Sequence, residues 1–248
     1  GHKALLKQFN TKRLQTYVES LIDSYNIPAL SLAVLHNGQL HQAAAGILNV
    51  ETGVEATPES SFQVGSITKV ITATLIMQLV DQGRVDLDAP VKHYLRDFQV
   101  ADSDATEKVT VRQLLSHTNG LDGDFFPDEP PTGGNPIARY VDRCCLLSQV
   151  HALGEKHSYS NTAYAIAGRL IEVVMGISWF KAVEEQIIQP LGLKNTFVDP
   201  VEAIRFRAAM GHMPSKVDAH PWMLAPTCYP PLGQAPAGST LSMSAADY

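Results

Sequence analysis

Apolar residues recur in two different ways at the start of the chain. Between residues 6 and 25 they include Leu14, Val18 and Leu21, a spacing that places them on one face of a helix. The next two segments, 29–35 and 39–45, are short and apolar or alternating, and Asn37 and Gly38 between them favour a type I′ turn. We therefore expect an amphipathic helix that ends near residues 26–28, followed by an antiparallel β-hairpin.

A helical spacing of apolar residues dominates the middle of the chain. It is clearest after residue 67, in Val70, Ile71, Leu75, Leu79 and Val80. Gly83 then provides a C-terminal stop. Further helices are predicted over 111–115, 137–147, 161–175 and 178–188, with a break at 190–192. Residues 199–238 are rich in proline and lack periodicity, so we expect a loop there.

The composition is that of a globular protein with a substantial core. Of the 248 residues, 45% are hydrophobic and 18% are charged, which suits one domain or two closely packed lobes. The pattern divides into an α/β lobe over 1–65, a mostly helical lobe over 66–198 and a loop-rich return over 199–248. A net charge of −6 argues against binding to nucleic acid or an anionic membrane, and no apolar run is long enough to span a bilayer.

The strongest candidate for chemistry is the pair Ser66 and Lys69, where an extended segment ends at Gly65 and a helix begins. A serine hydroxyl is a good nucleophile only when a nearby base takes its proton, and a lysine three residues later shares its helix face. No carboxylate lies between Glu59 and Asp81, so burial would favour the neutral, basic form of Lys69. The alternative is a lysine whose stem packs while its head reaches water, and the tetrad alone does not decide between the two.

The same Ser-x-x-Lys spacing occurs again at Ser178 and Lys181. There Ser178 is suited to cap a helix, and Lys181 has Glu184 and Glu185 as partners three and four residues later. We expect a structural role for this second copy.

A downstream tyrosine and asparagine favour the first copy as the reactive one. Tyr159 and Asn161 form the only Tyr-x-Asn sequence in the chain. A tyrosine near a lysine can relay a proton to a leaving group, and an asparagine amide can hold a substrate carbonyl or orient the lysine. Tyr159 by itself is more typical of a half-buried aromatic residue, so the prediction requires that the two motifs meet in the fold.

Four segments resemble the serine beta-lactamase family, in the branch that holds class C beta-lactamases, D-aminopeptidase-like and DD-carboxypeptidase-like peptidases and related esterases. They are FQVGSITK at 62–69, VRQLLSHTNGL at 111–121, YSN at 159–161 and PLGL at 190–193, in the family's order. The resemblance implies a beta-lactamase/transpeptidase-like α+β fold, with an antiparallel sheet flanked by helices and a mostly helical lobe. It also implies that Ser66 is acylated by an amide or ester, that Lys69 and Tyr159 share proton transfer, and that Asn161 contacts substrate. A periplasmic or secreted location follows from the resemblance alone.

One motif of that family is absent from the sequence. No Lys-Thr-Gly occurs, and residues 36–38, which fit a looser His-x-Gly variant, are better explained as the hairpin turn. The late sheet strands of the family are missing as well, so residues 1–248 are expected to form a single incomplete catalytic domain. A further segment or a second polypeptide would then complete the sheet. The chain alone would leave strand edges unpaired, be poorly stable and transfer acyl groups weakly.

The substrate class stays open between a beta-lactam, a D-amino-acid peptide and a small ester. The loop after Gly120 contains Asp122, Asp124, Asp128 and Glu129. A solvated acidic loop is the favoured interpretation. If the loop instead borders the site, its charge would disfavour carboxylate-bearing substrates and favour neutral esters or amine-bearing peptides.

Other functions of the same fold also stay open. They are a penicillin-recognising sensor that is acylated without turnover, a carboxylesterase, and a catalytically silent scaffold. A Ser-His-Asp hydrolase is disfavoured because the sequence has no Gly-x-Ser-x-Gly. No metal or organic cofactor is predicted, because neither His-Glu-x-x-His nor a phosphate-binding glycine loop occurs. The three cysteines, Cys144, Cys145 and Cys228, are interpreted as packing thiols.

Overall fold

The computed structural model describes residues 10–127, 133–216, 221–227 and 231–248. These residues form two compact units, each built from more than one stretch of the chain. Unit 1 takes its described residues from 1–63, 193–229 and 242–248, and unit 2 takes its own from 64–192 and 230–241. The predicted return over 199–248 is therefore divided, because its residues 230–241 belong to the mostly helical unit 2.

Unit 1 opens with a helix and a three-stranded antiparallel sheet in the order β1-β2-β3. The elements are α2 (Thr11–Tyr25), β1 (Ala29–His36), β2 (Gln39–Asn49) and β3 (Val54–Glu55). Ala29 pairs with Gly46 and His36 with Gln39 at the two ends of the hairpin. The helix and the hairpin that the apolar pattern predicts are confirmed.

Local backbone chemistry sets the ends of these elements. Asn37 and Gly38 have φ angles of 50° and 77°, and positive φ at both central residues is what a type I′ turn requires. α2 begins at Thr11 because the Asn10 side chain caps it, accepting from the N–H of Arg13 at 3.0 Å. Residues 6–9 of the predicted helix lie outside the described part of the chain.

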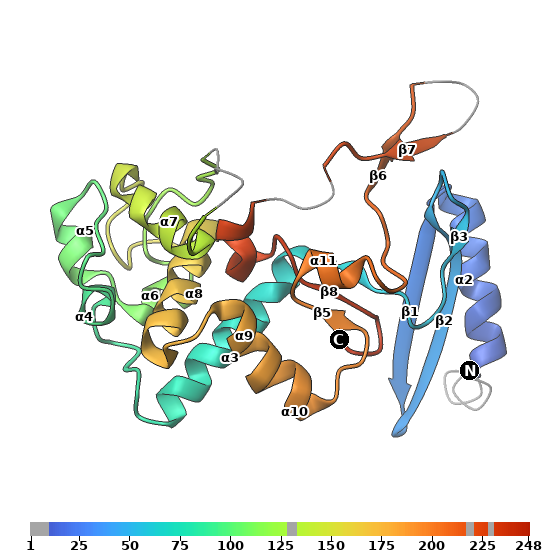
Figure 1. The fold of residues 1–248 in the computed structure, drawn as a ribbon, viewed down its shortest axis with the longest axis horizontal. Coiled ribbons are helices and arrows are strands. Elements are labelled where there is room, and N and C mark those ends of the chain that lie inside the picture. The colour runs from blue at the N-terminus through green and yellow to red at the C-terminus, as the bar shows by residue number, and fades with distance from the viewer. Residues whose placement is uncertain (1–9, 128–132, 217–220, 228–230) are drawn as a thin grey trace. The chain divides into compact units, whose positions relative to one another are not determined.

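α2 lies along the β1-β2 hairpin (Figure 1). Leu14 and Val18 of the helix and Ala43 of β2 are buried together, and apolar residues of both strands pack around them: Leu30, Leu32, Val34 and Ala45. Even positions of β1 point to one face of a strand, which is why three of these residues alternate. This small core fixes the register of the hairpin.

The remaining strands of unit 1 are short. β8 (Ser242–Met243) lies between β4 (Phe62–Gln63) and β5 (Thr196–Phe197), and β6 (His212–Pro214) pairs with β7 (Trp222–Leu224). The prediction of a loop over 199–238 is therefore wrong in part. The segment also contains α11 (Pro200–Ala203), whose start is capped by Asp199, and the 3₁₀ helix η4 (Leu232–Ala237). Elements this short carry too few residues to show a period in the sequence.

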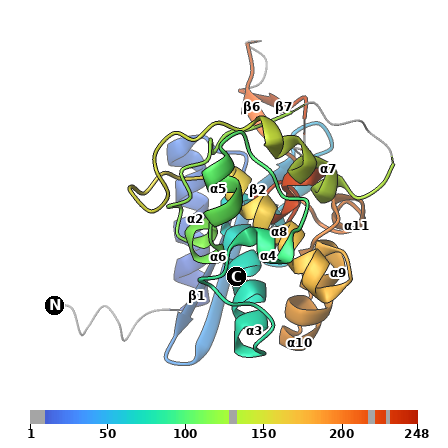
Figure 2. The same cartoon turned by 90° about the vertical axis from the view of Figure 1, so that its left-hand side faces the viewer.

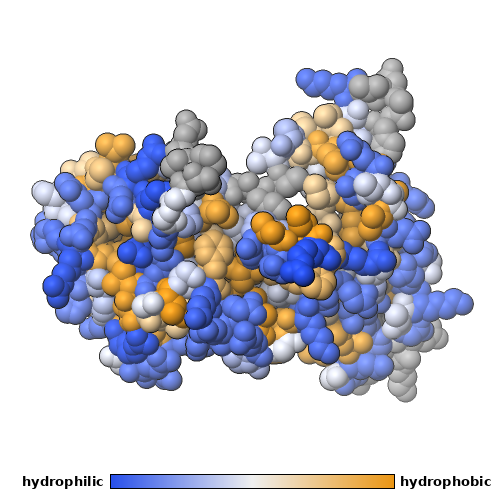
Figure 3. Space-filling model, in the orientation of Figure 1, coloured by the Kyte–Doolittle hydropathy of each residue, from blue (hydrophilic) through white to orange (hydrophobic). Residues whose placement is uncertain are grey.

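Apolar side chains remain exposed on unit 1. Near α11 they gather on the surface as a patch (Figure 3) that includes Val201, Ile204 and Phe206. β1 is an edge of its sheet and, within the described residues, pairs only with β2. The predicted unpaired strand edge is present in the structure.

Unit 2 is a cluster of helices around α8. Up to residue 175 its helical segments are η1 (Gly65–Ile67), α3 (Thr68–Asp81), α4 (Val91–Tyr94), α5 (Ser103–Lys108), α6 (Val111–Leu115), α7 (Pro136–Arg143), η2 (Cys144–Leu146) and α8 (Asn161–Met175). α4, α6 and α7 each contact α8, and Figures 1 and 2 show these helices grouped together. Ten of the fifteen residues of α8 are buried, so this helix forms the centre of the unit. The helices predicted over 111–115 and 161–175 are confirmed.

The predicted break at 190–192 lies at Gly192 and not at Pro190. The chain runs from α9 (Trp179–Val183) through a π-helical turn, η3 (Glu184–Ile188), into α10 (Gln189–Leu191). Pro190 lies in the first turn of α10, where a missing N–H is tolerated, and Gly192 ends the helix at a φ of 65°.

The second Ser-x-x-Lys copy is structural, as predicted. The Ser178 hydroxyl accepts from the N–H of Lys181 at 3.2 Å and caps α9. The Lys181 ammonium pairs with Glu185 at 3.5 Å on an exposed surface.

The packing-thiol interpretation holds for only one described cysteine. Cys144 is buried, and burial raises the pKa of its thiol. Cys145 is exposed because the predicted helix over 137–147 ends at Arg143 and the 3₁₀ turn that follows turns its side chain outward. Cys228 lies outside the described residues.

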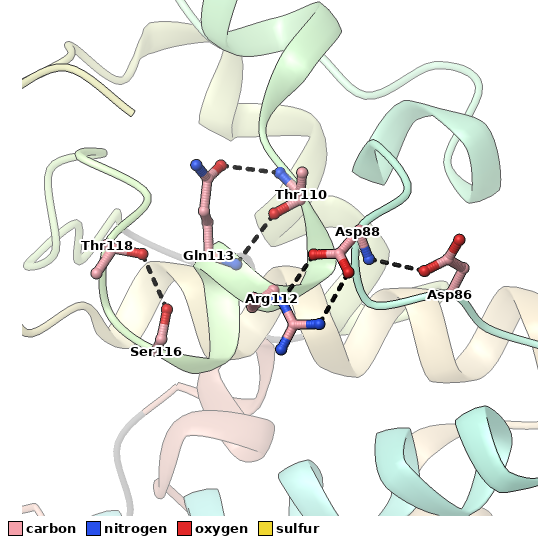
Figure 4. A network of polar contacts seen from close by, with 7 residues as sticks. All are labelled: Asp86, Asp88, Thr110, Arg112, Gln113, Ser116 and Thr118. Carbon is pink, nitrogen blue, oxygen red and sulfur yellow. Dashed lines mark hydrogen bonds and ion pairs between the residues drawn. The ribbon is translucent and has the colours of Figure 1, made fainter. Parts of the chain in front are cut away.

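A polar network holds the start of α6 (Figure 4). The Thr110 hydroxyl accepts from the N–H of Gln113, and the Gln113 side chain accepts from the N–H of Thr110, which is a capping box. Arg112 donates two hydrogen bonds to the Asp88 carboxylate, at 2.7 and 2.8 Å. Thus α6 and the loop that follows it have a defined position in unit 2.

Within the described ranges no single helix is long and apolar enough to cross a membrane; only the bent pair Asn161–Met175 and Trp179–Leu191 together meets that length and composition.

Candidate active site

Ser66 lies in a 3₁₀ turn that continues directly into α3. Its hydroxyl is exposed, and within the described part of the chain its backbone N–H has no acceptor. A free N–H at a helix start favours negative charge beside it. The prediction that Ser66 sits at a helix amino terminus is confirmed, with a 3₁₀ first turn in place of an α-helical one.

A tight approach of two backbones shapes the turn around Ser66. A Cβ at Gly238 would lie 2.5 Å from the carbonyl carbon and oxygen of Gly65 and 2.9 Å from the Ser66 nitrogen. The φ angle of Gly238 is 136°, which L side chains rarely adopt. Only glycine therefore lets the segment around residue 238 come this close to the candidate nucleophile.

Lys69 is buried, with 6% of its surface exposed, and its amine meets three oxygen atoms. Nζ lies 3.1 Å from Ser66 Oγ, 2.7 Å from Asn161 Oδ1 and 2.6 Å from the carbonyl oxygen of Ala237. The alternative interpretation, in which the head of Lys69 reaches water, is wrong for this structure.

These three partners determine what a neutral Lys69 amine would do. Asn161 Oδ1 and the Ala237 carbonyl can only accept hydrogen bonds, so they take the two N–H groups of a neutral amine. The nitrogen lone pair is then left for a hydroxyl, that of Ser66 at 3.1 Å or that of Tyr159, which also hydrogen-bonds with the amine. The geometry thus suits proton transfer from Ser66 Oγ to Lys69 Nζ.

Burial is also the largest influence on the basicity of Lys69. It lowers the pKa of the ammonium below its ordinary value, because a charged group loses solvation in the interior. Hydrogen bonding to Tyr159 and the negative charge of Asp124 act in the opposite direction and raise that pKa. The net effect makes the neutral amine more accessible than in a free lysine.

Tyr159 lies beside the Lys69 amine, and His117 packs against Tyr159. The Lys69 Nζ lies 4.8 Å from the centre of the Tyr159 ring, which is itself stacked on the His117 ring at 4.6 Å. His117 Nδ1 accepts from the N–H of Ser160 at 3.0 Å, so the proton of the neutral ring is on Nε2. Burial, and then the charges of His157 and Lys69, lower the pKa of His117 and keep the ring neutral.

Asn161 is the first residue of α8 and joins Lys69 to the acidic loop. Its Oδ1 accepts from Lys69, while its Nδ2 donates to Asp124 Oδ1 at 3.1 Å. Because a carboxylate only accepts, this contact defines which way the amide is turned. The favoured interpretation of a purely solvated loop fails at Asp124, which borders the site. Asp122 is exposed as that interpretation expects, and Asp128 and Glu129 lie outside the described residues.

The structure brings together all four residues that the sequence singles out, Ser66, Lys69, Tyr159 and Asn161, and all belong to unit 2. The Ala237 carbonyl was not foreseen, because a backbone oxygen leaves no signal in the sequence. His117 was not predicted as a site residue, although it lies in a segment that carries the family resemblance. Its positive φ of 58°, which is unusual for a residue other than glycine, marks it as well, but only the structure shows that angle. Among the described residues, no three His, Cys, Asp or Glu side chains form a group that could hold a metal ion.

Comparisons with known proteins show what the whole chain is similar to. The chain is 43% identical over 205 residues to penicillin-binding protein 4 of Amycolatopsis lactamdurans, which covers 83% of the chain and 54% of the relative. The crystal structure of SurE superposes with a TM-score of 0.80 and 30% identity, over 96% of this chain and 52% of that one. A class C beta-lactamase from Rhodobacter sphaeroides superposes with a TM-score of 0.72 and 29% identity, over 92% and 61%.

The chain therefore spans about half the length of the first two of these relatives. The model of the family described as Beta-lactamase matches residues 14–248, which is nearly all of the chain. These similarities cover both units and all four candidate residues. The chain belongs to the beta-lactamase family, and its fold is of the beta-lactamase/transpeptidase type.

Proposed function

We propose that this chain carries the acylation centre of a serine hydrolase that acts on an amide or ester through a Ser-Lys-Tyr mechanism. The contact that supports this most directly is the one between Lys69 Nζ and Ser66 Oγ at 3.1 Å, with Asn161 Oδ1 and the Ala237 carbonyl restricted to accepting from the amine. The Ser66 hydroxyl proton thus has a base within hydrogen-bonding distance, and the hydrogen bond of that base to Tyr159 offers a route for the proton afterwards.

In the first step Ser66 Oγ forms a bond to the substrate carbonyl carbon while its proton passes to Lys69 Nζ. The carbonyl oxygen becomes negative and accepts from the Ser66 N–H, which has no competing acceptor in the described residues. The bond to the leaving group then breaks, and the proton held by Lys69 reaches the leaving atom through Tyr159. Water later attacks the acyl-enzyme and releases the acid.

Asn161 has one role in orienting the base and one in binding. One N–H of its amide donates to Asp124 and its oxygen accepts from Lys69, so its second N–H is the group that can donate to a substrate carbonyl. The substrate classes consistent with this chemistry are beta-lactams, D-amino-acid peptides and small esters.

The test is to treat the chain with a fluorophosphonate probe and to locate the adduct by mass spectrometry. We expect labelling at Ser66 alone, loss of labelling in Ser66→Ala, and loss of most labelling in Lys69→Met. Ser178→Ala is the matched control, since it removes the serine of the second Ser-x-x-Lys copy and should leave labelling intact. An adduct at any other residue would overturn the assignment.

Turnover is measured separately with a p-nitrophenyl ester and with nitrocefin. Repeated turnover supports a hydrolase, whereas a stable adduct on Ser66 with no second turnover would indicate a penicillin-recognising sensor.

A further inference from the structure

Asp124 occupies an unusual position for an exposed carboxylate. One of its oxygens accepts from Asn161 Nδ2 at 3.1 Å, and the same amide accepts from Lys69, which contacts Ser66. Three hydrogen bonds therefore connect the carboxylate to the candidate nucleophile. Its charge reaches far enough to raise the pKa of Lys69.

The backbone on both sides of Asp124 is held in place. The Gly123 carbonyl accepts from the N–H of Asn161 at 3.0 Å, and a Cβ at Gly123 would lie 2.4 Å from the carbonyl oxygen of Tyr159. On the other side, the Phe125 carbonyl accepts from the Tyr140 hydroxyl at 2.8 Å and from the Gln234 side chain at 2.7 Å. A solvated loop would not need these contacts, so they indicate that the position of residue 124 is set by the fold.

The second carboxylate oxygen of Asp124 is available to a ligand. Among the described residues no Lys, Arg or His lies within ion-pair distance of Asp124, and Asn161 occupies only Oδ1. The acylation step requires a neutral Lys69. Among the described side chains, Asp124 is then the one charged group beside Ser66, Lys69, Tyr159 and Asn161. The site then carries a negative charge in front of an exposed nucleophile.

We infer that Asp124 is a specificity-determining residue that selects substrates with a protonated amine near the scissile carbonyl, such as peptides with a free amino terminus. This inference rests on the proposed acyl transfer at Ser66 and names its substrate class. The ammonium group donates to Asp124 Oδ2, which holds the neighbouring scissile carbonyl in front of Ser66 Oγ. A substrate with a carboxylate at that place is repelled by the same charge.

The experiment compares D-alanyl p-nitroanilide, which carries an ammonium group, with its neutral N-acetyl derivative. The variant is Asp124→Asn, which keeps an acceptor for Asn161 but removes the charge. Asp122→Asn is the matched control, because it lies in the same loop, is exposed and does not contact Asn161. We expect the chain to prefer the amine by roughly three- to tenfold in kcat/KM, a preference that Asp124→Asn abolishes and Asp122→Asn retains. The preference should also fall as ionic strength rises.

A binding measurement separates this inference from the chemistry. Ser66→Ala cannot form an acyl-enzyme, yet it should bind the amine more tightly than the acetyl derivative by calorimetry, and Ser66→Ala with Asp124→Asn should bind both equally. If Ser66→Ala prefers the amine but the parent chain forms no acyl-enzyme, the proposed hydrolase is contradicted while the role of Asp124 in binding is supported. Equal binding of the two ligands to Ser66→Ala, including no detectable binding of either, would overturn the inference.

Discussion

Gly238 offers the sharpest test of how the turn at Ser66 is built. In Gly238→Ala the new methyl group would lie 2.5 Å from the carbonyl of Gly65, and ordinary contact begins at 3.4 Å. Both neighbours are backbone atoms, so no flexible side chain can yield. The turn that carries Ser66 must therefore move by about 0.9 Å, and a misplacement of about 1 Å costs a reaction roughly 100-fold in rate.

Backbone strain has to be separated from this displacement. Gly176 is the matched control, since its φ of 74° is also positive but a Cβ there would meet nothing within 4 Å. The unfavourable φ should cost about 1–2 kcal/mol of stability in Gly176→Ala and about 1–3 kcal/mol in Gly238→Ala. Gly176→Ala should lose only that stability, whereas Gly238→Ala should lose reactivity in addition.

The assay follows the rate of fluorophosphonate labelling at Ser66 by mass spectrometry, together with urea unfolding of each variant. We expect labelling within about twofold of the parent chain for Gly176→Ala and about 100-fold slower for Gly238→Ala. If both variants lose similar stability and label at the parent rate, the contact between Gly238 and Gly65 does not position the nucleophile and the reasoning is refuted.

Three further results are expected. The acylation rate should rise as the pH passes through the lowered pKa of Lys69, since only the neutral amine accepts a proton. Asp124→Asn should move this rise to lower pH, because the charge of Asp124 raises the pKa of Lys69. If the rise occurs at the same pH in the variant, Asp124 does not influence Lys69. Glu172 is buried and accepts hydrogen bonds from Asn135, Arg169 and the N–H of Trp179. Glu172→Ala should therefore lower the free energy of unfolding by about 3–5 kcal/mol, whereas Glu185→Ala, which breaks an exposed ion pair, should lower it by less than about 0.5 kcal/mol. Similar losses for the two variants in urea unfolding would argue against a structural role for Glu172. Finally, Lys181→Met should leave probe labelling unchanged, and reduced labelling would mean that the second Ser-x-x-Lys copy also contributes.

Several elements could be predicted because short-range rules govern them. The faces of α2, the positive φ of Asn37 and Gly38, and the cap at Ser178 each depend on residues within about one turn of one another. The predictions failed where a segment was too short for a period or where tertiary contacts overrode local preference. The prediction of a loop over 199–238 failed at α11 and η4 for the first reason.

The candidate site divides in the same way. Ser66 and Lys69 meet because three residues of helix bring their side chains to one face, and this local geometry follows from the sequence alone. The sequence also supplied Tyr159 and Asn161 as partners, through their motif. It could not show that Lys69 would be buried, since burial depends on residues distant in the chain.

Only the tertiary structure decided how the lysine is used. Asn161 lies 92 residues from Lys69 along the chain and Ala237 lies 168 residues from it, yet both place acceptors on the same amine. Desolvation and the direction of the remaining lone pair are properties of that assembled environment, and so is the placement of Asp124 beside Asn161. A sequence specifies which groups are present, but the pKa and the orientation of a buried amine depend on what surrounds it in space.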